Sequence, residues 1–196
     1  MTINASMERV ISDNWQYTPL PNVPILQCKL GEDAQKFLWG LIDENSGVSH
    51  YLNDTDNYFF NNHLKEQCEK YIEDNKNAVT FRNSFTHSST SQLVMRDFWC
   101  TICKKNEPIP YHDHTGVLSF AIWLRMPGHS RFSLAYTDIL GQIRRIEFDT
   151  SDELVGNMIV FPATLGHQVY PFSETDGTRI SVSGNLYLDT SVIINS

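Results

Sequence analysis

Residues 117–126 read VLSFAIWLRM, and this run decides the fold class. It is rich in β-branched, aromatic and aliphatic residues, and the turn sequence MPGH follows it at 126–129. A short apolar run that ends at a turn is typical of a buried β-strand. We therefore predict a strand here.

Similar runs occupy most of the chain after residue 78. They are separated by turn residues such as ILGQ, ELVGN and ETDGT, and no helical pattern interrupts them. Closely spaced strands without intervening helices are typical of antiparallel sandwiches and barrels. The five further predicted strands are SQLVMRDFWCTIC (91–103), RFSLAYTD (131–138), QIRRIEFD (142–149), NMIVFP (157–162) and RISVSGNLYL (179–188).

The first part of the chain has a different pattern. The proline-punctuated segment TPLPNVPILQCKL (18–30) predicts an extended entry strand. Apolar residues then recur at helical spacing in two segments, which predicts amphipathic helices over 31–47 and 61–76, the second capped by Asn61 or Asn62. The apolar faces comprise Ala34, Phe37, Leu38, Leu41 and Ile42 in the first helix, and Leu64, Cys68, Tyr71 and Ile72 in the second.

These patterns predict a mostly β protein with N-terminal helices. We expect residues 1–196 to form one domain, with the strand and helices of residues 1–78 supporting a β-structure of residues 79–196.

The bulk composition excludes several classes of function. Hydrophobic residues make up 41% of the chain, charged residues 19% and aromatic residues 12%, which is typical of a soluble globular protein. The net charge of −8 is unsuited to nucleic-acid or membrane binding, because both favour a basic surface. The first residues lack the apolar core of a signal peptide, so we expect a cytoplasmic protein with neither nucleic acid nor membrane as a partner.

The four cysteines are expected to be reduced thiols. Cys100 and Cys103, in CTIC, have the spacing of a redox or zinc motif, but they lie in a predicted strand and would face opposite sides. Cys28 and Cys68 are isolated and supply no second pair for zinc. Simple burial is the favoured interpretation.

Three histidines form the candidate metal site. His112 and His114, in PIPYHDHTG (108–116), are expected at the start of a strand, where alternation points both side chains to one face. His167, in FPATLGHQVYPF, lies at another strand edge about fifty residues later, far enough for a barrel to return it. The remaining histidines have no partner nearby and are expected to be ordinary solvated or hydrogen-bonded side chains; they are His50, His63, His87 and His129.

A polar stripe completes the constellation. Arg179, Ser181 and Ser183 alternate with apolar residues along the last predicted strand, which places a guanidinium and hydroxyls on one face. A guanidinium inside a barrel can bind a carboxylate through two hydrogen bonds. A polar stripe directed to solvent is the alternative interpretation.

Three motifs in this order resemble the Fe(II)- and 2-oxoglutarate-dependent oxygenases, and most closely the phage-type members from cyanophages and marine bacteria. They are FWCTICKKNEPIPYHDHTGVLS (98–119), GNMIVFPATLGHQV (156–169) and RISVSGN (179–185). The resemblance extends over about residues 92–190 and implies a double-stranded β-helix, a jelly-roll or cupin-like barrel braced by the helices.

The resemblance also implies an activity and a site. His112, His114 and His167 correspond to the iron ligands, and Arg179 corresponds to the residue that pairs with the distal carboxylate of 2-oxoglutarate, with Ser181 as its hydrogen-bonding companion. Such an enzyme uses O₂ to hydroxylate a C–H bond while oxidising 2-oxoglutarate to succinate and CO₂. The substrate is a protein, a peptide or a small molecule, with a prolyl-hydroxylase-like activity ranked first. If the chain is phage-encoded, the enzyme would work in the cytoplasm of a bacterial host.

One position departs from the family pattern, because His114 stands where most members have a carboxylate. Either three imidazoles hold the metal, or Asp113 replaces His114 as a ligand. Adjacent strand residues face opposite ways, which favours the three histidines.

Other functions remain open at this stage. A zinc hydro-lyase or a three-histidine cupin dioxygenase would use the same imidazoles without a carboxylate clamp. A non-catalytic jelly-roll module for binding or structure would need no metal at all.

Overall fold

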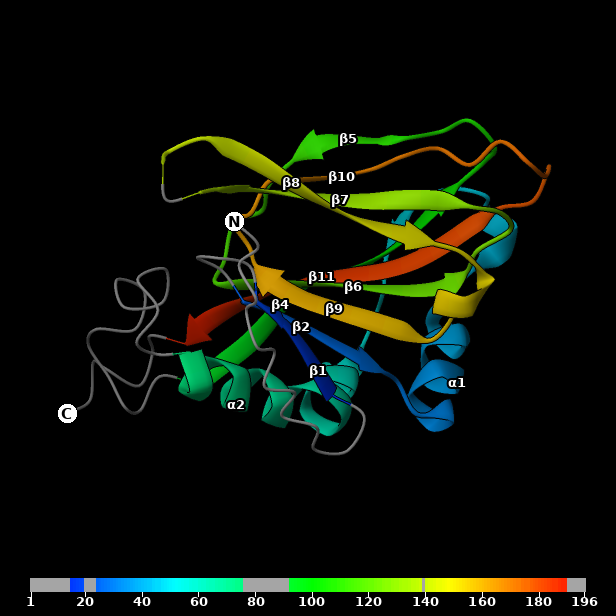
Figure 1. The fold of residues 1–196 in the computed structure, drawn as a ribbon. Helices are drawn as coiled ribbons and strands as arrows, with labels where there is room; N and C mark the ends of the chain where they lie inside the picture. The colour runs from blue at the N-terminus through cyan, green and yellow to red at the C-terminus, as the bar shows by residue number, and fades with distance from the viewer. Residues whose placement is uncertain (1–14, 20–23, 76–91, 139, 190–196) are drawn as a thin grey trace.

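The computed structural model describes residues 15–19, 24–75, 92–138 and 140–189. Two antiparallel sheets lie face to face as two layers, and helices cover the larger sheet on its other side (Figure 1). The predicted boundary near residue 78 and His87 both lie outside the described residues.

The larger sheet has seven strands in the order β1-β2-β9-β6-β11-β4-β3. All of its strand pairings among the described residues are antiparallel. Its strands are β1 (Trp15–Pro19), β2 (Pro24–Lys29), β3 (His50–Tyr51), β4 (Gln92–Cys103), β6 (Leu118–Arg125), β9 (Asn157–Pro162) and β11 (Arg179–Asp189).

The smaller sheet has four strands in the order β5-β10-β7-β8. From β4 onward the chain passes repeatedly between the two sheets, which is the path of a jelly roll. The predicted fold class is therefore confirmed. The strands of this sheet are β5 (Ile109–His112), β7 (Ser130–Thr137), β8 (Ile143–Thr150) and β10 (His167–Val169).

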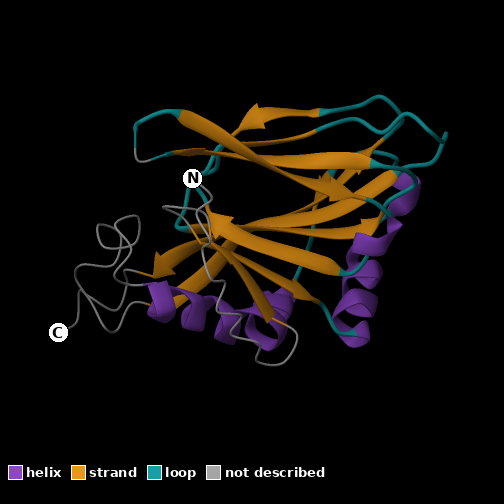
Figure 2. Cartoon of the chain, viewed as in Figure 1, coloured by secondary structure: helices purple, strands orange, loops and turns teal. Residues whose placement is uncertain are grey.

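Two helices lie on the larger sheet, as Figure 2 shows. Helix α1 (Glu32–Leu41) begins after Gly31, and its first turn carries Glu32 and Asp33, which interact favourably with the helix dipole. It ends six residues before the predicted end at Gly47, because Asp43 accepts a hydrogen bond from the backbone N–H of Asn45 and starts a separate 3₁₀ turn.

Helix α2 (Lys65–Asn75) continues directly from a π-helical turn at Phe60–Leu64. The predicted cap at Asn61 or Asn62 is wrong, because both side chains donate to backbone carbonyls of preceding residues. The capping side chain is Asp54, whose Oδ2 accepts from the backbone N–H of Phe59 at 2.9 Å. The helical segment therefore starts earlier than its apolar pattern indicates.

Two hydrophobic cores result. One lies between the helices and the larger sheet and includes Leu38, Leu64, Cys68 and Tyr71, which were predicted for the helix faces. The other lies between the two sheets around Trp123, Phe132 and Phe161. Strand β6 separates them and has seven buried residues in succession, because both of its faces are covered. This explains the continuous apolar run of residues 117–126.

Among the described residues, every helix is too short or too polar to cross a lipid bilayer.

Candidate metal centre

The three predicted histidines come together between the sheets. His112 and His167 are directly opposite in the antiparallel pair β5–β10, and a bulge follows His167. The candidate ligand nitrogens of His112, His114 and His167 lie within 4.8 Å of one another, and the ring centroids are 4.2 to 4.9 Å apart. This spacing allows three imidazoles to share one metal ion.

The predicted origin of the His112–His114 pair was wrong. His112 is the last residue of β5 and His114 lies in the following loop, since β6 starts only at Leu118. The backbone N–H of His114 donates to the carbonyl of Ala163 at 2.9 Å and anchors this loop beside β9. The two side chains converge because the loop turns, and strand alternation is not the cause.

Gly116 allows that turn. Its φ of +105° is one that side-chain-bearing residues rarely adopt, and a Cβ here would lie 2.7 Å from the carbonyl oxygen of Leu186. The next residue, Val117, donates its N–H to the same carbonyl at 2.8 Å. The loop is therefore held closely against β11, with His114 directed to the other histidines.

Backbone carbonyls orient two of the imidazoles. Nδ1 of His112 lies 2.7 Å from the carbonyl of Pro110, and Nδ1 of His167 lies 3.0 Å from that of Leu165. A neutral imidazole that donates from Nδ1 keeps an unprotonated Nε2, which is the arrangement of many metal-binding histidines.

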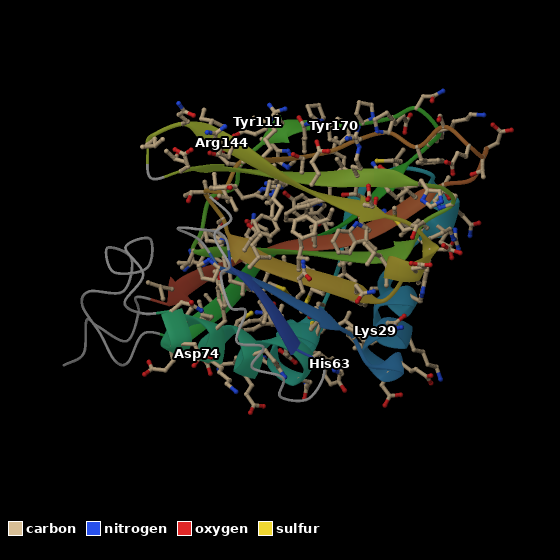
Figure 3. All side chains as sticks on the ribbon, viewed as in Figure 1. Lys29, His63, Asp74, Tyr111, Arg144 and Tyr170 are labelled. Carbon is tan, nitrogen blue, oxygen red and sulfur yellow. The ribbon has the colours of Figure 1, made fainter. Side chains whose placement is uncertain are left out.

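The side chains near these histidines in sequence do not orient them. The Tyr111 side chain lies on the outer face of the smaller sheet (Figure 3). Ser119 Oγ donates to Asn185 Oδ1 at 2.7 Å. Asp113 is exposed and is outside the three-histidine group, so the geometry favours the set with His114.

Burial keeps the imidazoles of His114 and His167 neutral. Desolvation lowers the pKa of His167 to about 4, assisted by the two neighbouring histidines. Desolvation and His112 also lower the pKa of His114, which the carboxylates of Asp113 and Asp97 partly oppose. Both rings are therefore unprotonated at neutral pH, which metal binding requires.

Arg179 is buried in the same region. It is the first residue of β11 and only 1% exposed. Its Nη1 donates to the carbonyl of Tyr170 at 2.8 Å and to Ser130 Oγ at 3.4 Å, and its Nη2 donates to the carbonyl of Glu107 at 3.5 Å. Among the described residues no carboxylate lies within salt-bridge distance of this guanidinium.

One cavity of about 90 Å³ connects the histidines with the arginine. Ser181 and Ser183 line it, so the predicted polar stripe faces the interior and not solvent. Further residues line the cavity without standing out in the sequence, namely Trp99, Thr101, Ile109, Phe120, Ala121, Trp123, Phe132, Phe161 and Val169. Trp99 and Thr101 could have been predicted, because they alternate with buried apolar residues along β4.

The hydroxyl that contacts Arg179 is that of Ser130, which sequence reasoning missed. Ser130 directly follows the turn sequence MPGH and resembles a turn residue. Ser181 makes no hydrogen bond with Arg179 among the described residues, although both line the cavity.

The other described histidines lie away from this centre. His50 is hydrogen-bonded to the Val48 carbonyl at 2.9 Å, and His129 is exposed. His63 contacts the rings of Tyr58 and Phe59 near α2, on the opposite side of the molecule from Tyr111 (Figure 3).

The four cysteines are free and buried. Cys100 and Cys103 pair with Val182 and Arg179 of β11, which places them on opposite faces of the sheet as predicted.

No protein-family model matches the sequence, and no curated protein matches it. Similar solved structures include a 2OG-Fe(II) oxygenase family oxidoreductase from Burkholderia pseudomallei, at 12% identity and a TM-score of 0.41, covering 88% of this chain and 72% of that chain. A Pseudomonas putida prolyl-4-hydroxylase matches at 14% identity and a TM-score of 0.45, covering 83% of this chain and 91% of that chain. The α-ketoglutarate-dependent carbocyclase SnoK of nogalamycin biosynthesis matches at 12% identity and a TM-score of 0.48, covering 84% of this chain and 79% of that chain. Since all three TM-scores are below 0.5, the function is inferred from the residues of the site.

Proposed function

We propose that the protein is a non-haem Fe(II)- and 2-oxoglutarate-dependent oxygenase that hydroxylates a C–H bond of its substrate. One observation carries this proposal: a buried guanidinium, which has no carboxylate partner within the described part of the chain, lines the same cavity as three convergent imidazoles. A buried charge costs folding free energy unless it is paired, so an uncompensated one indicates an anionic ligand.

The residues fit both groups. His112, His114 and His167 would hold the metal through Nε2, since nitrogen donors of this kind suit divalent iron as well as zinc. Arg179 would bind the distal carboxylate of 2-oxoglutarate, and its Nε makes no hydrogen bond among the described residues. The hydroxyl of Ser181 lines the cavity and is the proposed companion donor.

The bound iron and 2-oxoglutarate would supply the oxidation, with O₂ as oxidant and with succinate and CO₂ as products. The contribution of the chain is positioning and exclusion of water. Arg179 fixes one end of the cosubstrate. The rings of Phe132 and Phe161 keep the centre apolar, with their centroids 5.7 and 5.0 Å from the centroid of the His167 ring. An uncharged ligand set leaves the dianionic cosubstrate to balance the charge of the metal.

Arg179 distinguishes this function from the alternatives. Neither a zinc hydro-lyase nor a cupin that oxidises thiols needs a carboxylate clamp, and a binding module needs no convergent imidazoles. Within the proposal, a prolyl-hydroxylase-like reaction is the first activity to assay. The three motifs that resemble phage-type enzymes support a cytoplasmic role in a bacterial host.

Anaerobic titration with Fe(II) and 2-oxoglutarate tests the proposal. We expect a weak visible charge-transfer band with the wild type, no band with His167→Ala, and a band at much higher 2-oxoglutarate concentration with Arg179→Gln. His129→Ala removes an exposed histidine outside the site and should behave as wild type. Absence of the band, together with equal 2-oxoglutarate binding by Arg179→Gln and wild type, would overturn the proposal.

A further inference from the structure

A row of paired residues on β4 and β11 extends beyond the cavity. In an antiparallel pair, directly opposite residues share one face of the sheet. The row contains four opposite pairs, which are Cys103–Arg179, Thr101–Ser181, Trp99–Ser183 and Asp97–Asn185. Five of these residues line the cavity, so Asp97 and Asn185 lie on the same face, two residues past its wall. The row thus runs from a buried cation at one end to a carboxylate at the other.

The Asp97 carboxylate is held in one orientation. Its Oδ2 accepts hydrogen bonds from Asn185 Nδ2 at 3.1 Å and from the Tyr187 hydroxyl at 2.7 Å. Tyr187 is in turn hydrogen-bonded to the Thr115 hydroxyl at 2.8 Å, in the loop that carries His114. These contacts use the acceptor capacity of Oδ2 and fix the carboxylate beside the metal-binding loop.

The second oxygen, Oδ1, is available. Among the described residues it accepts no hydrogen bond, and it is not one of the fully buried polar atoms without a partner, so it is not fully buried. No ion pair of the described residues includes Asp97. The adjacent Arg96 instead places its guanidinium over the Tyr187 ring, 5.3 Å from the centroid.

Two aromatic residues lie near Asp97 in the sheet. Trp99 follows it on the same face, with its ring centroid 5.4 Å from that of His114. Tyr51 pairs with Trp99 from the edge strand β3 and is 75% exposed. A carboxylate near an exposed tyrosine and a partly buried tryptophan favours a cation over a neutral or anionic group.

The free oxygen also selects among cations. A guanidinium binds a carboxylate best through both oxygens, whereas an ammonium group is a point charge that one oxygen can hold. Because Oδ2 of Asp97 already accepts two hydrogen bonds, Oδ1 alone suits an ammonium group.

We propose that Asp97, with the Trp99 and Tyr51 rings, binds a primary ammonium group of the substrate and directs its aliphatic stem past Trp99 toward the three histidines. The inference rests on the proposed function, because only an oxygenase would make the bound amine a substrate. The ammonium site itself is defined by these residues alone. The substrate class is then an aliphatic amine, such as a lysine-type side chain, and on this inference it replaces a prolyl group as the first substrate to test.

Binding of two matched probes to the full chain tests this site. Nα-acetyl-lysine methylamide and Nα-acetyl-norleucine methylamide differ in the terminal ammonium group, and calorimetry or tryptophan fluorescence can follow either without turnover. We expect the lysine probe to bind about tenfold more tightly, as a charge-assisted hydrogen bond requires. In Asp97→Asn the preference should fall below twofold, because the amide keeps an oxygen for Asn185 and Tyr187 but loses the charge.

Asp113→Asn is the matched control, because Asp113 is the other carboxylate that acts on His114, and it should keep the preference. Equal binding of the two probes by wild-type protein would overturn the inference even if Asp97→Asn failed to fold. Tighter binding of the corresponding arginine probe would overturn the assignment to an ammonium group. If the iron and 2-oxoglutarate band is absent while the lysine preference persists, the proposed function fails and the ammonium site stands.

Discussion

At Arg179 a full positive charge lies in the protein interior with only uncharged partners among the described residues. A buried charge without an opposite charge costs folding free energy, and under the proposed function the benefit of this residue is ligand binding. Arg179→Met should therefore weaken 2-oxoglutarate binding at least about 30-fold, the equivalent of about 2 kcal/mol for a lost charged contact. The free energy of unfolding should stay equal or rise, since the Tyr170 carbonyl keeps the Ser130 hydroxyl as a donor. Ligand titration and urea unfolding measure the two effects.

Arg144→Met is the comparison for this prediction. Arg144 is exposed and pairs with Asp138 at 2.8 Å, and an ion pair at the surface contributes little to stability. It should change neither 2-oxoglutarate binding nor stability by much. A loss of more than about 2 kcal/mol of unfolding free energy in Arg179→Met would show that the guanidinium is a structural residue.

Residue identity was the most predictable part of the site. The three histidines and Arg179 were found because imidazole and guanidinium groups stand out at their motif spacing. Ser130 and Asp97 were missed, because a serine after a turn and an aspartate in a strand are common on any surface. Their roles depend on neighbours brought together by the fold, which are Arg179 for Ser130 and Asn185 with Tyr187 for Asp97.

At the scale of elements, the loop between β5 and β6 is the sensitive segment. Gly116→Ala would place a Cβ 2.7 Å from the Leu186 carbonyl at a φ of +105°. The conformation alone costs about 1–2 kcal/mol, and the contact adds to it. We expect a loss of more than about 2 kcal/mol in urea unfolding, with weaker metal binding because His114 is displaced.

Gly47 provides a matched control for the loop. Its φ is also positive, at +62°, but a Cβ there would meet nothing within 4 Å. Gly47→Ala should cost about 1 kcal/mol and leave metal affinity unchanged. Equal effects of the two substitutions would mean that the close approach of the loop to β11 is unimportant.

Elements with a strong pattern were predicted well. The six strands predicted after residue 78 match β4, β6, β7, β8, β9 and β11 to within a residue or two. The single entry strand predicted over 18–30 is instead an antiparallel pair, β1 and β2. The short strands β5 and β10 were not recognised as separate elements, because three or four residues near proline or glycine carry no alternation. These two strands carry His112 and His167, so the detailed geometry of the metal site could not be predicted from the sequence pattern.

At the scale of the whole molecule, the larger sheet separates two cores with different roles. The core beneath the helices contains Cys28, Cys68 and Cys100 and stabilises the sheet. The space between the sheets contains the aromatic core and the candidate site. The division follows from alternation along β4 and β11, whose residues contribute in turn to one side and the other. Polar residues of the site are thereby kept apart from the apolar layer.

The three thiols make stability sensitive to alkaline pH. Burial raises the pKa of Cys28 and Cys100 to about 12 and that of Cys68 well above its usual value, whereas unfolded thiols ionise near 9.0. The unfolded state alone therefore loses these protons as the pH rises from about 9, and the free energy of unfolding falls by about 1.4 kcal/mol per pH unit for each thiol. Urea unfolding from pH 8 to 10.5 measures the slope, and Cys68→Ala should reduce it by one thiol's share. An unchanged slope in that variant would mean that tyrosine and lysine side chains, and not the buried thiols, cause the alkaline loss of stability.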